Sequence, residues 1–274
     1  MKAAASKAKF NDLGLRARSA LVLVPAVLVV VWLGGGWFSI FAAGLGVMMA
    51  REWVQIAHGG NSQQFALHSV AVIAAVLLGP EAALETILVL TVVSMAVVFM
   101  SASVWTVWKF LGVPYVALLP LALVVFRSDG RFGLQAIIWC LLVVWCADVM
   151  AYFVGRMIGG PKLAPQLSPK KTWAGLGGAV IGAALASVSI SLLAVQTIWP
   201  LVILAAILAL AEQSGDIFES AFKRSHNVKD SGDIIPGHGG VLDRVDGLIA
   251  VVVLAALFGF ARNYSSAAAG LFGW

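Results

Sequence analysis

The feature that most constrains this chain is a series of apolar runs, many of which approach the roughly 20 residues that a helix needs to cross a bilayer. Residues 248–260, for example, are apolar on every side of a helix. Only 11% of the 274 residues are charged, which is less than half of the share, about 25%, in an ordinary soluble domain. Because lipid offers no partner to an unpaired backbone group, helices are the expected spanning elements. We therefore predict an all-α, polytopic integral membrane protein.

Hydropathy predicts about nine membrane-spanning helices. The first two would form a short hairpin around Gly34, Gly35 and Gly36. A cleaved signal peptide is the alternative interpretation of the first run, because five Lys and Arg residues precede it, but no clear small-residue cleavage site follows. The predicted helices cover residues 20–33, 37–56, 65–79, 83–101, 110–126, 134–154, 173–194, 199–221 and 247–260.

The distribution of basic residues predicts a cytoplasmic N-terminus. With nine spans and that orientation, all but three of the 18 Lys and Arg residues lie on the cytoplasmic side, the exceptions being Arg127, Arg131 and Arg262. No basic stripe with interleaved aromatic residues is left over, so nucleic acid is not an expected partner. Cys140 and Cys146 lie six residues apart in one apolar run and are expected to be small buried side chains without a disulfide.

Two polar stretches, 155–172 and 212–246, interrupt the apolar pattern, and both are predicted to be cytoplasmic, where they can face each other across one site. The second stretch holds seven of the chain's 13 acidic residues. Spacings of four, three and four place Glu212, Asp216, Glu219 and Lys223 on one face of a helix, and Asp243 and Asp246 would share a face at the start of the last span. For Glu219 and Lys223 alone, a solvated helix end with an i,i+4 ion pair is an equally good interpretation.

Crowded carboxylates repel each other, so their concentration beside basic residues predicts a counter-charge. Hard oxygen ligands favour Mg²⁺ or Ca²⁺ over Zn²⁺. Mg²⁺ binds through a few carboxylates together with substrate phosphates, and the neighbouring bases would hold the remaining phosphate oxygens. Asp148, within an apolar span, would either complete this metal site or pair with Arg156. The pattern thus predicts a phosphoryl or nucleotidyl transfer site.

Two further segments are predicted to contact phosphate. In residues 235–240, glycines flank His238, so backbone N–H groups can approach a phosphate, and His238 can act as a phosphate donor or proton carrier. Ser168 followed by Pro169 predicts a helix start, with Ser168 as the N-cap. Lys170 and Lys171 would then lie in the first turn, where the helix dipole disfavours cations unless an anion is bound.

The segment 220–246 resembles the signature of the phosphatidate cytidylyltransferase, or CDP-diacylglycerol synthase, family. Similar elements lie outside it, around Asp148, in residues 168–173 and in residues 213–219, so the resemblance covers roughly the C-terminal half of the chain. The N-terminal half resembles the family only in being several apolar helices. The matching signature positions are Ser220, Phe222, Lys223, Arg224, Lys229, Asp230, Gly232, Ile235, Pro236, His238, Gly239, Gly240, Val241, Asp243, Arg244 and Asp246.

This resemblance implies transfer of CMP from CTP to the phosphate of phosphatidic acid, giving CDP-diacylglycerol and pyrophosphate. It implies a requirement for Mg²⁺, with K⁺ as a candidate second ion. Residues 1–133 would hold about five helices, and residues 134–274 would form the catalytic region, with cytoplasmic polar loops at 155–172 and 222–246. The expected setting is a bacterial inner membrane, with the active site facing the cytoplasm and open to the bilayer, and a homodimer is the expected assembly.

The resemblance also implies roles for individual residues. The expected metal ligands are Asp216, Asp243, Asp246 and Asp148. The expected catalytic residues are Asp216, Lys223, Arg224, His238, Asp243 and Asp246. The expected substrate-binding residues are Ser168, Lys170, Lys171, Ser220, Lys223, Arg224, Lys229, His238, Gly239, Gly240 and Arg244.

Two other functions compete with this interpretation. One is another CTP-dependent lipid enzyme of the membrane, either a polyprenol kinase, which would release CDP, or a cytidylyltransferase that acts on ether lipids. The other is a cation-coupled transporter, which predicts acidic residues near the bilayer midplane in two related halves. The acidic residues here cluster in one region, and the sequence has no evident internal repeat.

Overall fold

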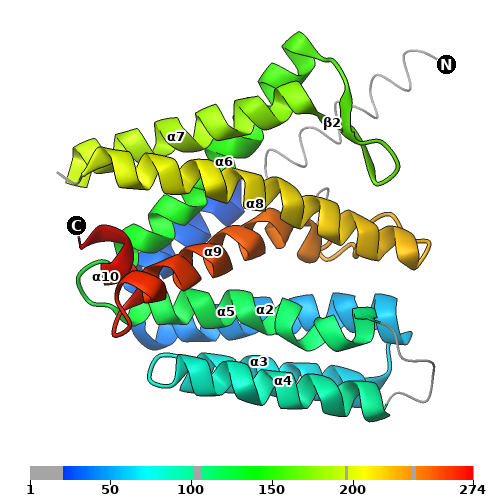
Figure 1. Ribbon diagram of the computed structural model, residues 1–274. Helices are drawn as coiled ribbons and strands as arrows, with labels where there is room; N and C mark the ends of the chain where they lie inside the picture. The colour runs from blue at the N-terminus through cyan, green and yellow to red at the C-terminus, as the bar shows by residue number, and fades with distance from the viewer. Residues whose placement is uncertain (1–20, 101–106, 195–196, 236–238, 274) are drawn as a thin grey trace.

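A computed structural model describes residues 21–100, 107–194, 197–235 and 239–273, which are almost entirely helical. A helix at Leu21–Leu33 precedes the labelled elements of Figure 1. These are α2 (Gly35–His58), α3 (Ser62–Leu78), α4 (Ala83–Met100), α5 (Val107–Ser128), α6 (Gly133–Ile158), β1 (Lys162–Ala164), β2 (Ser168–Thr172), α7 (Trp173–Ala194), α8 (Ile198–Ser225), α9 (Leu242–Arg262) and α10 (Ala267–Phe272).

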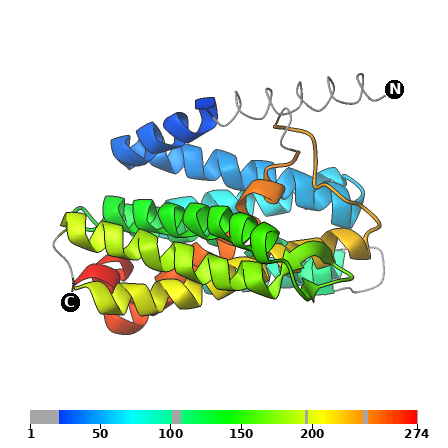
Figure 2. The same cartoon turned by 90° about the horizontal axis from the view of Figure 1, so that it is seen from above.

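The helices pack as a bundle in which α3 and α4 form one outer layer and α6 and α7 the opposite one (Figure 1). Between them, α2 packs on α5, and α8 lies between α7 and α9. Figure 2, from above, shows the same helices running roughly along one axis. The β-hairpin lies at one end of the bundle and α10 at the other (Figure 1). Residues of α8 and α9 therefore share the centre of the molecule with helices from both halves of the chain.

In the described part of the chain, six helices are long and apolar enough to cross a membrane, namely α2, α5, α6, α7, α8 and α9. Three shorter apolar helices cover Leu21–Leu33, Ser62–Leu78 and Glu85–Met100. Each of the nine predicted segments overlaps one of these helices. The all-α, polytopic membrane architecture is thus confirmed, whereas the count of nine spans and the cytoplasmic N-terminus stay predictions.

The predicted helix start at Ser168 is wrong. Ser168–Thr172 forms β2, which pairs antiparallel with β1 through Lys162 with Thr172 and Ala164 with Ser168. The helix starts only at Trp173, and the Thr172 hydroxyl accepts the Gly175 N–H at 3.0 Å as its cap. Lys170 and Lys171 therefore lie on a strand, where successive side chains point to opposite sides. Lys170 is exposed and Lys171 is half-buried.

Candidate active site

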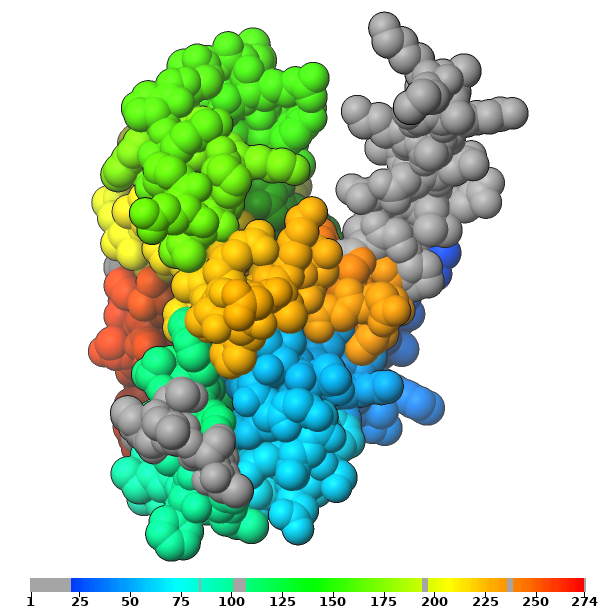
Figure 3. All heavy atoms as spheres, turned by 90° about the vertical axis from the view of Figure 1, so that its right-hand side faces the viewer, coloured from blue at the N-terminus to red at the C-terminus, as the bar shows by residue number. Residues whose placement is uncertain are grey.

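The polar side chains gather at the end of the bundle that carries the hairpin. Figure 3 shows this end, with the C-terminal part of α8 and the segment after it, in gold, between the green hairpin and the blue end of α2 and α3. The surface is recessed between the hairpin and the gold segment (Figure 3). The two predicted polar stretches meet here, because Lys171 of β2 forms an ion pair with Asp216 of α8 and lies 3.5 Å from the Gln213 carbonyl oxygen.

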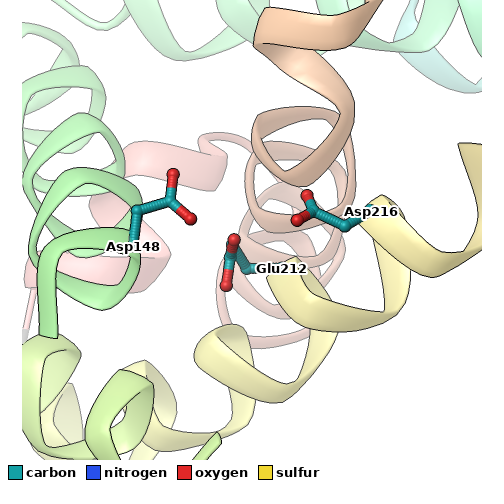
Figure 4. A group of neighbouring side chains, drawn as sticks. All are labelled: Asp148, Glu212 and Asp216. Atoms are coloured by element: carbon teal, nitrogen blue, oxygen red, sulfur yellow. The ribbon is translucent and has the colours of Figure 1, made fainter. Parts of the chain in front are cut away.

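Three carboxylates form an acidic cluster, which we define as Asp148, Glu212 and Asp216. Asp148 projects from α6 toward Glu212 and Asp216, which lie one turn apart on α8 (Figure 4). One oxygen from each residue lies within 4.8 Å of the other two. Asp148 is exposed, Glu212 buried and Asp216 half-buried. Of the two roles predicted for Asp148, the structure places it in this cluster, while Arg156 bonds to the Tyr152 hydroxyl at 2.7 Å.

The cluster has the donor set and charge of a divalent cation site. The Glu212 Oε2 atom accepts a hydrogen bond from Gln213 Nε2 at 2.7 Å, but its buried Oε1 atom has no donor among the described residues. Lys171 contributes a positive charge beside three acids. An orphaned carboxylate oxygen in such a group fits a hard metal ion, which takes oxygen ligands. These residues can hold a metal ion.

Glu212 is absent from the predicted metal ligands, although a signal for it existed. Its spacing of four residues from Asp216 places both on one helix face, as the sequence indicated. Asp148 was among the predicted ligands, and the structure brings one of its oxygens within 4.8 Å of those of Glu212 and Asp216. The helical spacing that pairs Glu212 with Asp216 was therefore the signal that could have identified Glu212.

Gly247 of α9 leaves room for the acidic cluster. A Cβ atom at this position would lie 3.1 Å from Glu212 Oε1 and 3.2 Å from Asp216 Oδ1. The neighbouring Asp246 accepts the Gly247 N–H at 2.9 Å, and its carboxylate interacts electrostatically with those of Asp216 and Glu219. Asp246 therefore borders the cluster from α9.

Asp243, also predicted as a metal ligand, lies in a different environment. Its Oδ1 atom is 2.5 Å from Lys223 Nζ, and its Oδ2 atom accepts from the Ser231 N–H and hydroxyl, both at 2.9 Å, and from the Gly240 N–H at 3.0 Å. Lys223 also contacts Glu219 at 3.2 Å. We call Asp243, Lys223, Ser231 and Gly240 the Asp243 network. In this structure the Gly240 N–H is thus engaged by a carboxylate rather than open to a phosphate.

The other predicted residues surround these two groups. Ser168 and Ser220 are half-buried, and Gly239 has a left-handed backbone with φ of 86°. Arg224 donates to the Val228 carbonyl oxygen at 3.1 Å. His238 lies outside the described residues, so its predicted role has no structural counterpart here. Lys170, Arg224, Lys229 and Arg244 are exposed.

Comparison with known proteins gives one family for most of the chain. The cytidylyltransferase family matches residues 14–261. A phosphatidate cytidylyltransferase of Brucella abortus is 38% identical over 253 residues, which cover 91% of this chain and 94% of that protein. One of Rickettsia typhi is 44% identical over 139 residues, or 48% of this chain and 61% of that protein. Since the match extends through both halves of the sequence, the chain belongs to the cytidylyltransferase family.

Proposed function

We propose that this protein transfers CMP from CTP to the phosphate of phosphatidic acid, giving CDP-diacylglycerol and pyrophosphate. The observation that carries this proposal is the similarity, over nine-tenths of the chain, to proteins named phosphatidate cytidylyltransferases. The acidic cluster supports it, because Lys171 of the first polar stretch and Arg244 of the second interact electrostatically with its carboxylates.

The main obstacle to this reaction is the repulsion between two anionic substrates. A phosphate oxygen of phosphatidic acid attacks the α-phosphorus of CTP, a new P–O bond forms, and the bond to pyrophosphate breaks. Preorganised positive charge lowers such a barrier because no solvent has to reorganise during the reaction. The residues of the chain need only orient and neutralise the two phosphates, so no covalent enzyme intermediate is required.

The acidic cluster is the proposed Mg²⁺ site. Asp216, Glu212 and Asp148 would hold the ion, with Asp246 bordering it, and bound Mg²⁺ would neutralise phosphate charge. Asp243, although predicted as a ligand, is proposed to act through Lys223, which it holds beside Glu219. K⁺ is proposed as the second ion.

Basic residues are proposed to hold the phosphate oxygens. Lys171 already lies against Asp216, so a bound triphosphate would meet its ammonium group at the cluster. Lys223 approaches from the Asp243 network. The remaining proposed phosphate contacts are Ser168, Lys170, Ser220, Arg224, Lys229, His238, Gly239 and Arg244. Gly240, although predicted as a contact, donates its N–H to Asp243 instead.

The two substrates come from different phases, and this bears on how the protein is oriented in the membrane. Phosphatidic acid resides in the bilayer and CTP in the aqueous phase, so the site must be reached from both. We propose that the end with the hairpin and the N-terminus face the cytoplasm, in the inner membrane of a bacterium, and that nine helices span it. The division into N-terminal helices 1–133 and a catalytic region 134–274, and assembly as a homodimer, are parts of the same proposal.

The direct test is an assay of detergent-purified protein with CTP and phosphatidic acid, with and without Mg²⁺, in which both products are identified. We expect Mg²⁺-dependent CDP-diacylglycerol and pyrophosphate. Asp216→Asn should abolish both products, whereas Asp233→Asn, which changes an exposed acid outside the cluster, should leave turnover intact. Release of CDP, or turnover only with a polyprenol or an ether-linked lipid, would contradict the proposed reaction.

A further inference from the structure

Glu52 of α2 is a buried carboxylate that the reaction chemistry above does not use. It is 3% exposed and lies in the N-terminal half of the chain. Its Oε1 atom accepts the Val241 N–H at 2.8 Å, and its Oε2 atom accepts the Leu242 N–H at 2.8 Å and the Ser231 hydroxyl at 3.0 Å. Since the first N–H groups of a helix lack partners within it, Glu52 supplies the acceptors for the start of α9.

Two glycines between α8 and α9, Gly232 and Gly240, lie against this carboxylate. A Cβ atom at Gly232 would lie 2.9 Å from Glu52 Oε1, and one at Gly240 would lie 1.9 Å from Ser231 Oγ and 2.7 Å from Glu52 Oε2. A side chain at either position would therefore displace the hydrogen-bonded Glu52 or Ser231 side chain. Glycine at these two positions of the signature motif keeps the segment in contact with Glu52, a residue that lies outside the motif.

Ser231 connects Glu52 to the Asp243 network. Its hydroxyl lies 3.0 Å from Glu52 Oε2 and 2.9 Å from Asp243 Oδ2. Asp243 in turn holds Lys223 at 2.5 Å. The hydroxyl has one proton, which the two carboxylates share, and the Ser231 N–H also donates to Asp243 Oδ2 at 2.9 Å. Ser231 therefore links Glu52 to Asp243 and, through Asp243, to the ammonium group of Lys223.

The next residue of α2, Trp53, contacts the helix that carries Lys223. Trp53 is fully buried and stacks on Phe222, the neighbour of Lys223, with ring centroids 3.8 Å apart and an interplanar angle of 5°. Such contacts between aromatic rings add to the stabilisation from burial. Two consecutive residues of α2 thus hold both the helix that carries Lys223 and the helix that carries Asp243. In Figure 3 this end of α2 lies next to the end of α8.

We propose that Glu52 is a positioning residue for CMP transfer. It fixes residues 231–232 and 240–242 and, through Ser231 and Asp243, the direction of Lys223, while the acidic cluster is held independently by α6 and α8. The expected loss of kcat rests on the proposed function, whereas the expected loosening of the backbone around Ser231 does not. Through Glu52, the N-terminal half of the chain also helps to orient the residues that bind the phosphates.

The test compares Glu52→Gln with Glu85→Gln, which removes the charge of an exposed Glu on α4. In Glu52→Gln an amide NH₂ replaces one acceptor oxygen and faces an N–H donor. A displacement on the order of 1 Å near a reacting group costs about 100-fold in rate, so we expect kcat to fall by about that factor. Mn²⁺ affinity, measured by electron paramagnetic resonance, should stay unchanged. Glu85→Gln should leave kcat unchanged.

Hydrogen–deuterium exchange supplies a structural readout that does not depend on the reaction. We expect faster exchange in the peptide covering residues 231–242 of Glu52→Gln, and unchanged exchange in α6 and α7. Wild-type kcat, or faster exchange throughout the protein together with lost Mn²⁺ binding, would overturn the proposal. If the wild-type protein does not transfer CMP, the proposed function fails, and the exchange pattern alone then decides whether Glu52 holds the segment.

Ser231→Ala provides a second variant in case Glu52→Gln does not fold. It removes only the hydroxyl that connects Glu52 with Asp243, so we expect a smaller loss of kcat, about tenfold or less. The double variant should lose no more activity than Glu52→Gln alone, because both changes interrupt the same link between Glu52 and Asp243. Losses that multiply would show that the two residues act independently, and would overturn the proposal.

Discussion

The acidic cluster lies on α6 and α8, and the Asp243 network lies on α8, α9 and the segment between them. The carboxylates of these two neighbouring groups are partnered in opposite ways. In the cluster, Glu212 Oε1 has no donor among the described residues, and Asp148 is exposed. In the network, both oxygens of Asp243 are taken by four donor groups. A carboxylate with open oxygens can bind a cation, whereas a saturated one organises the chain around it.

The largest expected effect is that of Asp216→Asn, which removes one charge from the cluster. If the cluster holds the catalytic cation, kcat should fall by about 1,000-fold or more, because several kcal/mol of charge stabilisation are lost. The unfolding temperature without metal should change little, since the weaker repulsion among the three acids offsets the weaker ion pair with Lys171. Retention of more than a tenth of the activity would remove Asp216 from the metal site.

Asp243→Asn should affect stability as well as activity. The amide leaves Lys223 without its closest carboxylate and places an NH₂ group near other donors, which costs about 1–3 kcal/mol for each buried group left unsatisfied. We expect a lower unfolding temperature and a kcat that is reduced less than in Asp216→Asn. Circular dichroism melting and the product assay measure both. An unchanged melting temperature would contradict the organising role of Asp243.

Gly247→Ala tests how closely α9 packs on the cluster. The added Cβ atom would lie 3.1 Å from Glu212 Oε1 and 3.2 Å from Asp216 Oδ1, so it crowds the oxygens that are proposed as ligands. We expect the concentration of Mg²⁺ that gives half-maximal activity to rise by about tenfold, since each tenfold corresponds to about 1.4 kcal/mol. Gly177→Ala on α7, whose Cβ would meet nothing within 4 Å, is the matched control and should leave this concentration unchanged.

The smallest effects are expected from neighbouring lysines of β2. Lys171 contacts Asp216 and Lys170 is exposed, so Lys171→Ala should raise the KM for CTP more than Lys170→Ala does. A rise of about tenfold for Lys171, against about threefold or less for Lys170, matches the loss of one charge-assisted contact. Equal effects of the two substitutions would indicate that the hairpin contributes only its net charge.

Local periodicity was sufficient to predict the helices and the acidic face of α8. Glu212, Asp216, Glu219 and Lys223 follow helical spacing, and α8 continues to Ser225, so all four lie on one helix as predicted. The structural placement of Asp148 beside this face was one of two options left open by its sequence context. Such features are visible in a sequence because each depends on residues within a few turns.

Contacts between distant segments could not be predicted from the sequence. Ser168 and Pro169 look like a helix start, but pairing of β2 with β1 and the cap provided by Thr172 determine the local structure. Likewise, the glycines of residues 235–240 suggested freedom to approach phosphate, whereas Gly240 lies against Glu52, about 190 residues away along the chain. No spacing rule connects α2 with that segment.

The central claim, that the acidic cluster and not the Asp243 network binds the cation, is tested most directly by metal titration without nucleotide. Mn²⁺ binding to the purified protein would be measured by electron paramagnetic resonance for the wild type, Asp216→Asn and Asp243→Asn. We predict that Asp216→Asn loses binding and that Asp243→Asn retains wild-type affinity. Loss of Mn²⁺ binding in Asp243→Asn, with binding retained in Asp216→Asn, would contradict the claim.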